Sequence, residues 1–163
     1  MADLVEYISW RGDLDFKKAP FCRIDALIFA GLSYINFQDC VDADFTTQIT
    51  LSEAWKKFSS LPDYEKRRGL GAMLNPKIIE LFEACAKSER FSSIKMSGYR
   101  TVFDENLEEQ FGAIVFEPER GLNCVTFRGT DDTLIGWKED FNLGYLDVVA
   151  SQAESKVYLE EAA

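Results

Sequence analysis

The sequence contains no histidine among its 163 residues, and this absence excludes several kinds of catalytic site. A Ser-His-Asp triad or a Cys-His pair cannot be assembled from this chain alone, because both use an imidazole as general base. Zinc sites with histidine ligands and the two-histidine facial triad are excluded for the same reason. An enzyme of these classes would therefore need residues from outside this chain.

Positive charge is also scarce. The chain has 18 Lys and Arg against 28 Asp and Glu, a formal net charge of −10. Nucleic acid demands a basic surface, so this balance argues against it as a partner, and a basic helix lying on a membrane is equally unsupported. The longest apolar run, residues 26–37, is too short for a membrane span, and the N-terminus lacks the basic start of a signal peptide. We expect a soluble cytoplasmic protein without a membrane span.

The four cysteines are too far apart in sequence to form a Cys-x-x-Cys pair, so no zinc knuckle or thioredoxin-like motif is present. Their even number is compatible with disulfides, although a chain of this length does not need them. Cys22, Cys85 and Cys124 lie in apolar stretches, where a reduced thiol behaves as a small hydrophobe. We predict reduced, mostly buried thiols, and neither a metal nor a cofactor.

The first half of the chain favours helices. Apolar residues make up 47% of the sequence, which is ample for a core, and in residues 21–37 they recur every three or four positions. Thr50 and Glu53 form a capping-box pattern that predicts a helix through Leu61. Asn75-Pro76 predicts another helix start. A short helix is expected over residues 3–10.

After residue 90 the pattern changes to strands. Residues 94–103 favour an extended segment, and two continuous apolar runs, 111–116 and 122–127, flank a Pro/Gly turn at 117–121. Runs without alternation suit strands that are buried on both faces. Helices are expected over 133–141 and 151–163, the second with Ser151 as N-cap and Glu154 as its capping-box partner. We therefore predict one domain, about 1–90 helical and about 91–163 strand-rich with flanking helices.

Residues 123–132, Asn-Cys-Val-Thr-Phe-Arg-Gly-Thr-Asp-Asp, precede Gly-Trp-Lys-Glu-Asp-Phe at 136–141. This segment resembles the strand-to-loop motif of class 3 (fungal-type) lipases. Together with residues 7–13, 32–34 and 96–99, it makes nearly the whole chain similar to an uncharacterised family of bacterial lipase-like proteins, labelled only as a domain of unknown function. The resemblance implies an α/β fold: the N-terminal part of an α/β-hydrolase, with a helical first half followed by strands of a mixed sheet.

The resemblance also implies roles for three residues. Serine acyl transfer stabilises an oxyanion with backbone N–H donors, one of which comes from a loop after an early strand. By the resemblance, Thr130 is an oxyanion donor, Gly129 gives the oxyanion loop its sharp turn, and Asp140 orients the Thr130 hydroxyl. Ordinary structural interpretations remain for the neighbours: Arg128 as an ion-pair partner, Trp137 as a core residue, and residues 131–132 as solvated turn or capping residues.

The chain departs from the lipase pattern in its nucleophile and base. No serine lies in a Gly-x-Ser-x-Gly elbow; the nearest, Ser97, lacks the first glycine. In the family, nucleophile, acid and histidine all follow the oxyanion loop, and this chain ends at a helix that would lead into another strand. We therefore expect an incomplete hydrolase domain over residues 1–163, inert alone, whose intact protein would cleave a small acyl or ester substrate.

Two alternatives from other classes remain. One is a non-catalytic structural or interaction module, which the absent nucleophile and histidine favour. The other is an enzyme that uses carboxylates, although Glu105, Glu108 and Glu109 are typical of a solvated surface. For an incomplete hydrolase, one sheet edge would lie uncovered. The expected partner is then the missing C-terminal half of the domain, or a second copy of the chain.

Overall fold

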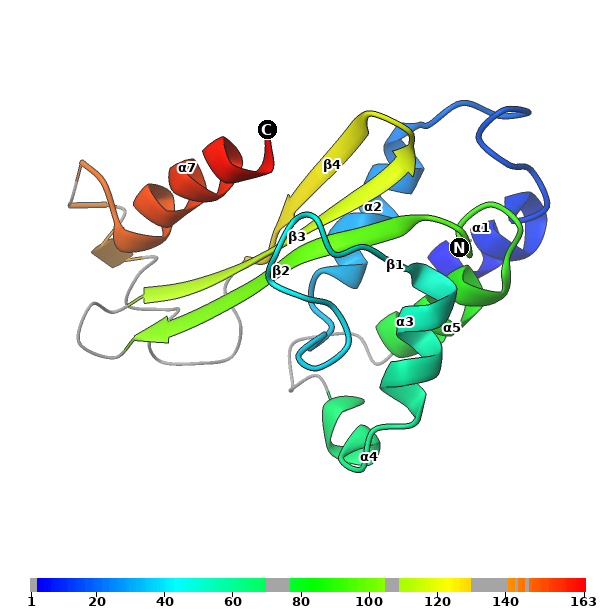
Figure 1. The fold of residues 1–163 in the computed structure, drawn as a ribbon, viewed down its shortest axis with the longest axis horizontal. Helices are drawn as coiled ribbons and strands as arrows, with labels where there is room; N and C mark the ends of the chain where they lie inside the picture. The colour runs from blue at the N-terminus through cyan, green and yellow to red at the C-terminus, as the bar shows by residue number, and fades with distance from the viewer. Residues whose placement is uncertain (1–2, 70–76, 105–108, 130–140, 143, 146) are drawn as a thin grey trace.

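The computed structural model describes residues 3–69, 77–104, 109–129, 141–142, 144–145 and 147–163. Most of the described helices come first in the chain and the longer strands follow (Figure 1). The elements in chain order are α1 (Leu4–Arg11), α2 (Arg23–Leu32), β1 (Ile49–Thr50), α3 (Leu51–Ser59), α4 (Tyr64–Arg67), α5 (Lys77–Lys87), β2 (Lys95–Asp104), β3 (Glu109–Glu119), β4 (Leu122–Phe127) and α7 (Ala150–Ala162).

The described strands form one antiparallel sheet in the order β1-β2-β3-β4. This differs from the mixed sheet that the sequence led us to expect. The reason lies in the connections, because parallel neighbours need a crossover of about a dozen residues or more. Only a tight turn at Arg120-Gly121 joins β3 to β4, and Gly121 has φ +81°, a conformation that glycine adopts without strain.

Strand β3 is buried on both faces, as its continuous apolar run predicts. Ile114 and Phe116 point into the main core with the helices of the first half of the chain. Phe111, Ala113 and Val115 point to the opposite face, where Tyr158 of α7 packs on them. The sheet is therefore a middle layer between the N-terminal helices and α7 (Figure 1).

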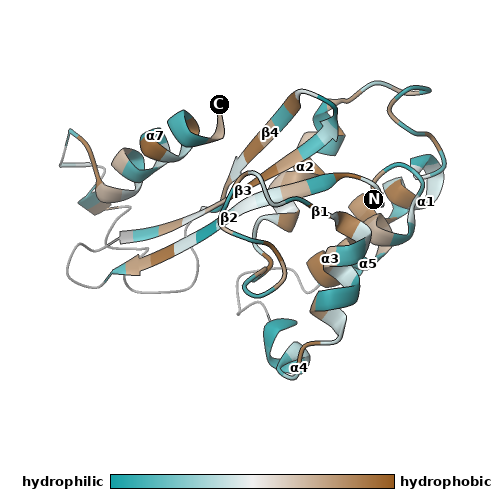
Figure 2. Ribbon diagram, in the orientation of Figure 1, coloured by the Kyte–Doolittle hydropathy of each residue, from teal (hydrophilic) through white to brown (hydrophobic). Residues whose placement is uncertain are grey.

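Aromatic rings carry much of the contact between α2 and the sheet. The rings of Phe29 and Phe116 lie 4.5 Å apart between centroids and almost parallel, and both side chains are fully buried. Along α3 the apolar and polar residues alternate around the helix (Figure 2), and Leu51, Ala54 and Phe58 are the buried ones. This stripe places α3 against the same core.

Local capping signals locate several helix starts. The predicted capping box before α3 is confirmed: the Glu53 amide donates to the Thr50 hydroxyl at 3.2 Å, and the Thr50 amide donates to the Glu53 carboxylate at 3.0 Å. Asp3 caps α1 in the same way with Glu6. The predicted Asn75-Pro76 start and nearly all of the predicted helix at 133–141 lie outside the described residues.

Other helix boundaries differ from the prediction. Helix α2 ends at Leu32 and not near residue 37; Ile35 and Phe37 beyond it are fully buried in non-helical backbone. The capping box at Ser151 and Glu154 is wrong: α7 begins at Ala150, and the Gln152 side chain accepts the Val149 amide at 3.2 Å. Glu154 instead pairs with Arg100 of β2.

The predicted turn at 117–121 is shorter than expected. β3 continues through Pro118, and only Arg120 and Gly121 form the turn. Proline removes a backbone donor from a ladder, so it is tolerated where the pairing is interrupted. The β3–β4 register shifts between Phe116 and Glu119, at the position of this proline.

All four cysteines are free thiols, as predicted. Cys40 and Cys85 are buried and Cys124 is half-buried, but Cys22 is exposed, contrary to the expectation from its apolar neighbours. Cys22 immediately precedes α2, where the chain is still at the surface. Burial raises the pKa of the Cys40, Cys85 and Cys124 thiols, so these three are weak nucleophiles at neutral pH.

Candidate functional site

The end of β4 is where the lipase-like motif leaves the sheet. Phe127 pairs with Ala113 of β3, and the Arg128 amide extends this ladder by donating to the Gly112 carbonyl at 2.7 Å. The Arg128 side chain then crosses β3 above Gly112 and donates to the Thr101 hydroxyl of β2 at 3.1 Å. These bonds fix the backbone up to the residue before Gly129.

Gly112 makes room for this crossing. A Cβ atom at residue 112 would lie 3.0 Å from Arg128 Nε, which is buried and has no hydrogen-bond partner among the described residues. The side chain of Arg128 is thus held by packing over a glycine as well as by its bond to Thr101. The Arg128 guanidinium therefore links β4 to β2 across β3.

We expect Gly112→Ala to lower the free energy of unfolding by about 1–3 kcal/mol, because the added methyl group overpacks against Arg128. The comparison is Gly31→Ala in α2, where the nearest atom to the new methyl is 3.8 Å away and alanine should stabilise the helix by about 0.5–1 kcal/mol. Urea titration followed by circular dichroism measures both. A Gly112→Ala chain as stable as the control would show that the crossing contributes nothing.

Gly129 is the predicted site residue that the structure describes. It is exposed and lies against Tyr34, whose hydroxyl is 3.0 Å from the position a Cβ atom would take at 129. The other predicted residues, Thr130 and Asp140, lie outside the described residues, as do Trp137 and residues 131–132. Their roles in an oxyanion loop remain predictions.

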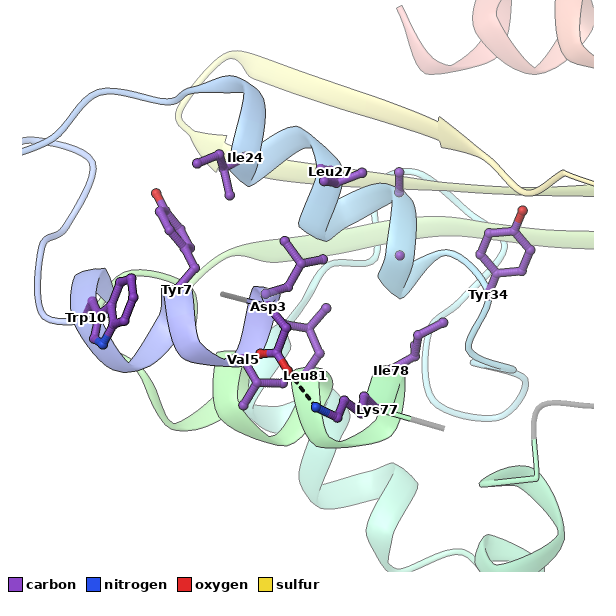
Figure 3. A pocket seen from close by; sticks show the side chains of 13 residues that line it. Asp3, Val5, Tyr7, Trp10, Ile24, Leu27, Tyr34, Lys77, Ile78 and Leu81 are labelled. Atoms are coloured by element: carbon purple, nitrogen blue, oxygen red, sulfur yellow. Dashed lines mark hydrogen bonds and ion pairs between the residues drawn. The ribbon is translucent and has the colours of Figure 1, made fainter. Parts of the chain in front are cut away.

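Tyr34 also belongs to a groove that the sequence did not reveal. The groove has a volume of about 830 Å³ and is bounded by residues of α1, α2, α5 and their flanks. In Figure 3, Tyr7 and Trp10 lie at one end and Tyr34 at the other, with Ile24, Leu27 and Leu81 between them. Gly129 is therefore next to one end of an apolar groove.

The helical repeat of α2 held a signal for this groove. Apolar residues cover more of the helix than one buried stripe needs: Ile28 and Leu32 face the core, whereas Ile24 and Leu27 are 42% and 57% exposed. An apolar stripe of this width indicates a second contact surface. It does not say which elements complete that surface.

A buried ion pair holds the segment that leads into α2. Arg90 donates from Nε and Nη2 to the two Asp25 carboxylate oxygens at 2.9 and 2.6 Å, and from Nη1 to the carbonyls of Leu14 and Ala19 at 2.8 Å each. The guanidinium also lies 4.1 Å from the centroid of the Phe16 ring. This pair fixes α2, and hence one wall of the groove.

Ser97, the serine nearest to an elbow sequence, is not placed as a nucleophile. It is buried inside β2 and pairs with Val115 of β3, whereas a nucleophile elbow is a sharp strand-to-helix turn. The described residues bring together no group of three or more metal-ligating side chains, and none of their helices is long and apolar enough to cross a membrane.

A family model described as Mbeg1-like matches residues 85–163, just under half of the chain. No curated protein and no solved structure matches. The matched segment contains β2, β3, β4 and α7, together with the lipase-like motif. The groove residues all precede it.

Proposed function

We propose that this chain supplies the oxyanion loop and part of the sheet of a lipase-like acyl hydrolase, whose nucleophile and base come from residues outside it. The observation that supports this is the junction at Gly129. Strand β4 ends just before Gly129, where the Arg128 side chain donates a hydrogen bond to Thr101 of β2. The Phe-Arg-Gly-Thr sequence continues from this point into the proposed loop. Such a strand end can hold a backbone donor in a fixed orientation, which oxyanion stabilisation requires.

In this proposal each residue has one task. Gly129 permits the turn close to Tyr34, Thr130 directs its amide and hydroxyl to the oxyanion, and Asp140 holds the Thr130 hydroxyl. Loss of one oxyanion donor in a serine hydrolase costs about 10²–10³-fold in kcat. The substrate would be a small acyl or ester compound, and the rest of the catalytic domain would be the partner of the β4 edge.

The first test is the inertness of the chain itself. We expect the purified 163-residue chain to show no labelling by a fluorophosphonate probe and no hydrolysis of p-nitrophenyl butyrate, since it has no histidine base. Coding sequence adjacent to this segment should supply a Gly-x-Ser-x-Gly elbow and a later histidine. Their absence from the gene, or labelling of this chain, would overturn the proposal.

The second test uses a longer polypeptide that contains the elbow. Thr130→Val should lower kcat by at least about tenfold and leave KM nearly unchanged, because the hydroxyl acts on the transition state. The control is Thr47→Val, an exposed threonine beside β1. Equal activities in the two variants would contradict the role of Thr130 as an oxyanion donor.

A further inference from the structure

The groove between α1, α2 and α5 has the character of a ligand site. Its volume of about 830 Å³ falls within the range of about 300–1,000 Å³ that is typical of small-molecule pockets. The side chains at its rim are apolar and exposed to water: Trp10 is 66% exposed and Leu27 is 57% exposed. Covering these side chains with an apolar ligand removes apolar surface from water, which is favourable.

The charged side chains that line the groove form an ion pair with each other. Among the residues that line it, the charged ones are Asp3 and Lys77, and the Lys77 ammonium lies 2.6 Å from the Asp3 carboxylate (Figure 3). The hydrogen bond from Lys77 lowers the pKa of Asp3, and the bond to Asp3 raises the pKa of Lys77, so both stay charged and paired at neutral pH. A carboxylate ligand would have to compete with Asp3 and would meet a chain of net charge −10.

Two phenol hydroxyls lie near the two ends of the groove. The Tyr34 hydroxyl is at the end next to Gly129, and the Tyr7 hydroxyl is at the other, 3.8 Å from the Cys22 sulfur (Figure 3). Between them the wall is aliphatic, with Ile24, Leu27 and Leu81. This arrangement suits a ligand with a long apolar body and an uncharged polar end that can exchange a hydrogen bond with a phenol hydroxyl.

We propose that this groove binds the single aliphatic chain of a neutral lipid, with its uncharged head group at one of the two tyrosines. The site is formed by described residues within 3–34 and 77–81, outside the segment that the Mbeg1-like model matches, and it does not depend on the proposed hydrolase. A lipid chain fills a groove of this kind without any charged partner.

Binding of straight-chain alcohols to the 163-residue chain tests the proposal. By titration calorimetry below their aggregation concentrations, we expect saturable one-to-one binding that tightens from octanol to dodecanol. The upper limit is about fourfold in Kd for each methylene that is fully buried. Dodecanoate, with the same apolar chain and a charged head, should bind more weakly than dodecanol.

Two exposed alanines give a matched pair of variants. Ala30→Phe adds a ring on the face of α2 that lines the groove and should abolish binding, whereas Ala153→Phe adds the same ring on α7 and should leave binding unchanged. Because both alanines are exposed, both variants should keep the circular dichroism spectrum of the parent. Absence of saturable binding, an affinity independent of chain length, or equal loss in the two variants would overturn the proposal.

Light scattering tests a different occupant of the groove, a second copy of the chain. A dimer that Leu27→Asp converts to monomer, while Leu159→Asp does not, would assign the groove to self-association and contradict lipid binding. Inertness of the chain toward fluorophosphonate bears only on the hydrolase proposal, so the two proposals can fail separately.

Discussion

Replacing Arg90 with leucine should lower the free energy of unfolding by about 3–5 kcal/mol, because it leaves Asp25 as a buried and unpaired carboxylate. The Asp25 side chain is fully buried and that of Arg90 is 2% exposed. The substitution also removes the guanidinium donors to the carbonyls of Leu14 and Ala19, which hold the segment before α2. Urea unfolding followed by circular dichroism measures the loss.

Two controls separate the buried charge from the lost packing. Arg90→Leu combined with Asp25→Leu should recover the part of the loss that comes from the unpaired charge, while the Leu14 and Ala19 carbonyls stay without their donor. Lys18→Leu breaks the exposed pair with Glu89 and should have only a small effect, because both side chains are more than half exposed. An Arg90→Leu effect as small as that of Lys18→Leu would show that the pair does not hold the fold.

The free energies of unfolding of the native chain and of Arg90→Leu should depend on pH with opposite signs. In the native chain burial by itself raises the pKa of Asp25, but the bonds from Arg90 and the Cys22 amide outweigh it and hold the pKa below 3.8. The pair therefore stabilises the fold at neutral pH, and this contribution is lost as the pH falls through the lowered pKa. In Arg90→Leu the Arg90 contributions are gone, and burial acts on the pKa of Asp25 against the hydrogen bonds from the Cys22 amide and side chain. We expect burial to dominate and raise its pKa, so this variant should gain stability as the pH falls from 7 toward 5.

The sequence predicts those parts of the fold that depend on near neighbours. The capping box of Thr50 and Glu53 closes within one turn, so it forms wherever the helix is placed. The double burial of β3 follows from its unbroken apolar run. The same prediction is wrong for β4, which lies at the edge of the sheet with Leu122 and Phe127 exposed. Ser151 and Glu154 have the same local pattern but fail, because Arg100, more than 50 residues earlier, offers Glu154 an ion pair.

The candidate site likewise has one part that depends on near neighbours in the sequence and another that depends on how distant segments pack. The motif at the end of β4 can be found in the sequence, because its residues are contiguous and a strand precedes them. The groove cannot, because Leu27 could equally face the core, and only the positions of α1 and α5 place it beside Trp10 and Leu81. The contact of Tyr34 with Gly129 likewise depends on how α2 packs on the sheet.

Tyr158 should be the second position with a large effect, because one side chain joins α7 to the outer face of the sheet. It is fully buried, its hydroxyl donates to the Gly98 carbonyl at 2.7 Å, and its ring lies 5.1 Å from that of Phe45 and 6.0 Å from that of Phe111. Gly98 has φ +65°, and a Cβ atom there would overlap the Phe45 ring. Because Gly98 has no side chain, Phe45 and Tyr158 of α7 can lie close to β2 at this position.

Tyr158→Ala should lower the free energy of unfolding by about 3–5 kcal/mol, the range for removal of a buried aromatic side chain. Tyr158→Phe should lose about 1–3 kcal/mol, because it leaves the Gly98 carbonyl without its donor. Leu159→Ala, a neighbour that is 46% exposed, is the control and should change little. Hydrogen exchange locates the effect: in Tyr158→Ala, the amides of α7 should lose protection first, while those of α3 keep it. Equal stability of all three variants would mean that α7 does not cover this face in solution, and β3 would then lose one of the two layers that its apolar run requires.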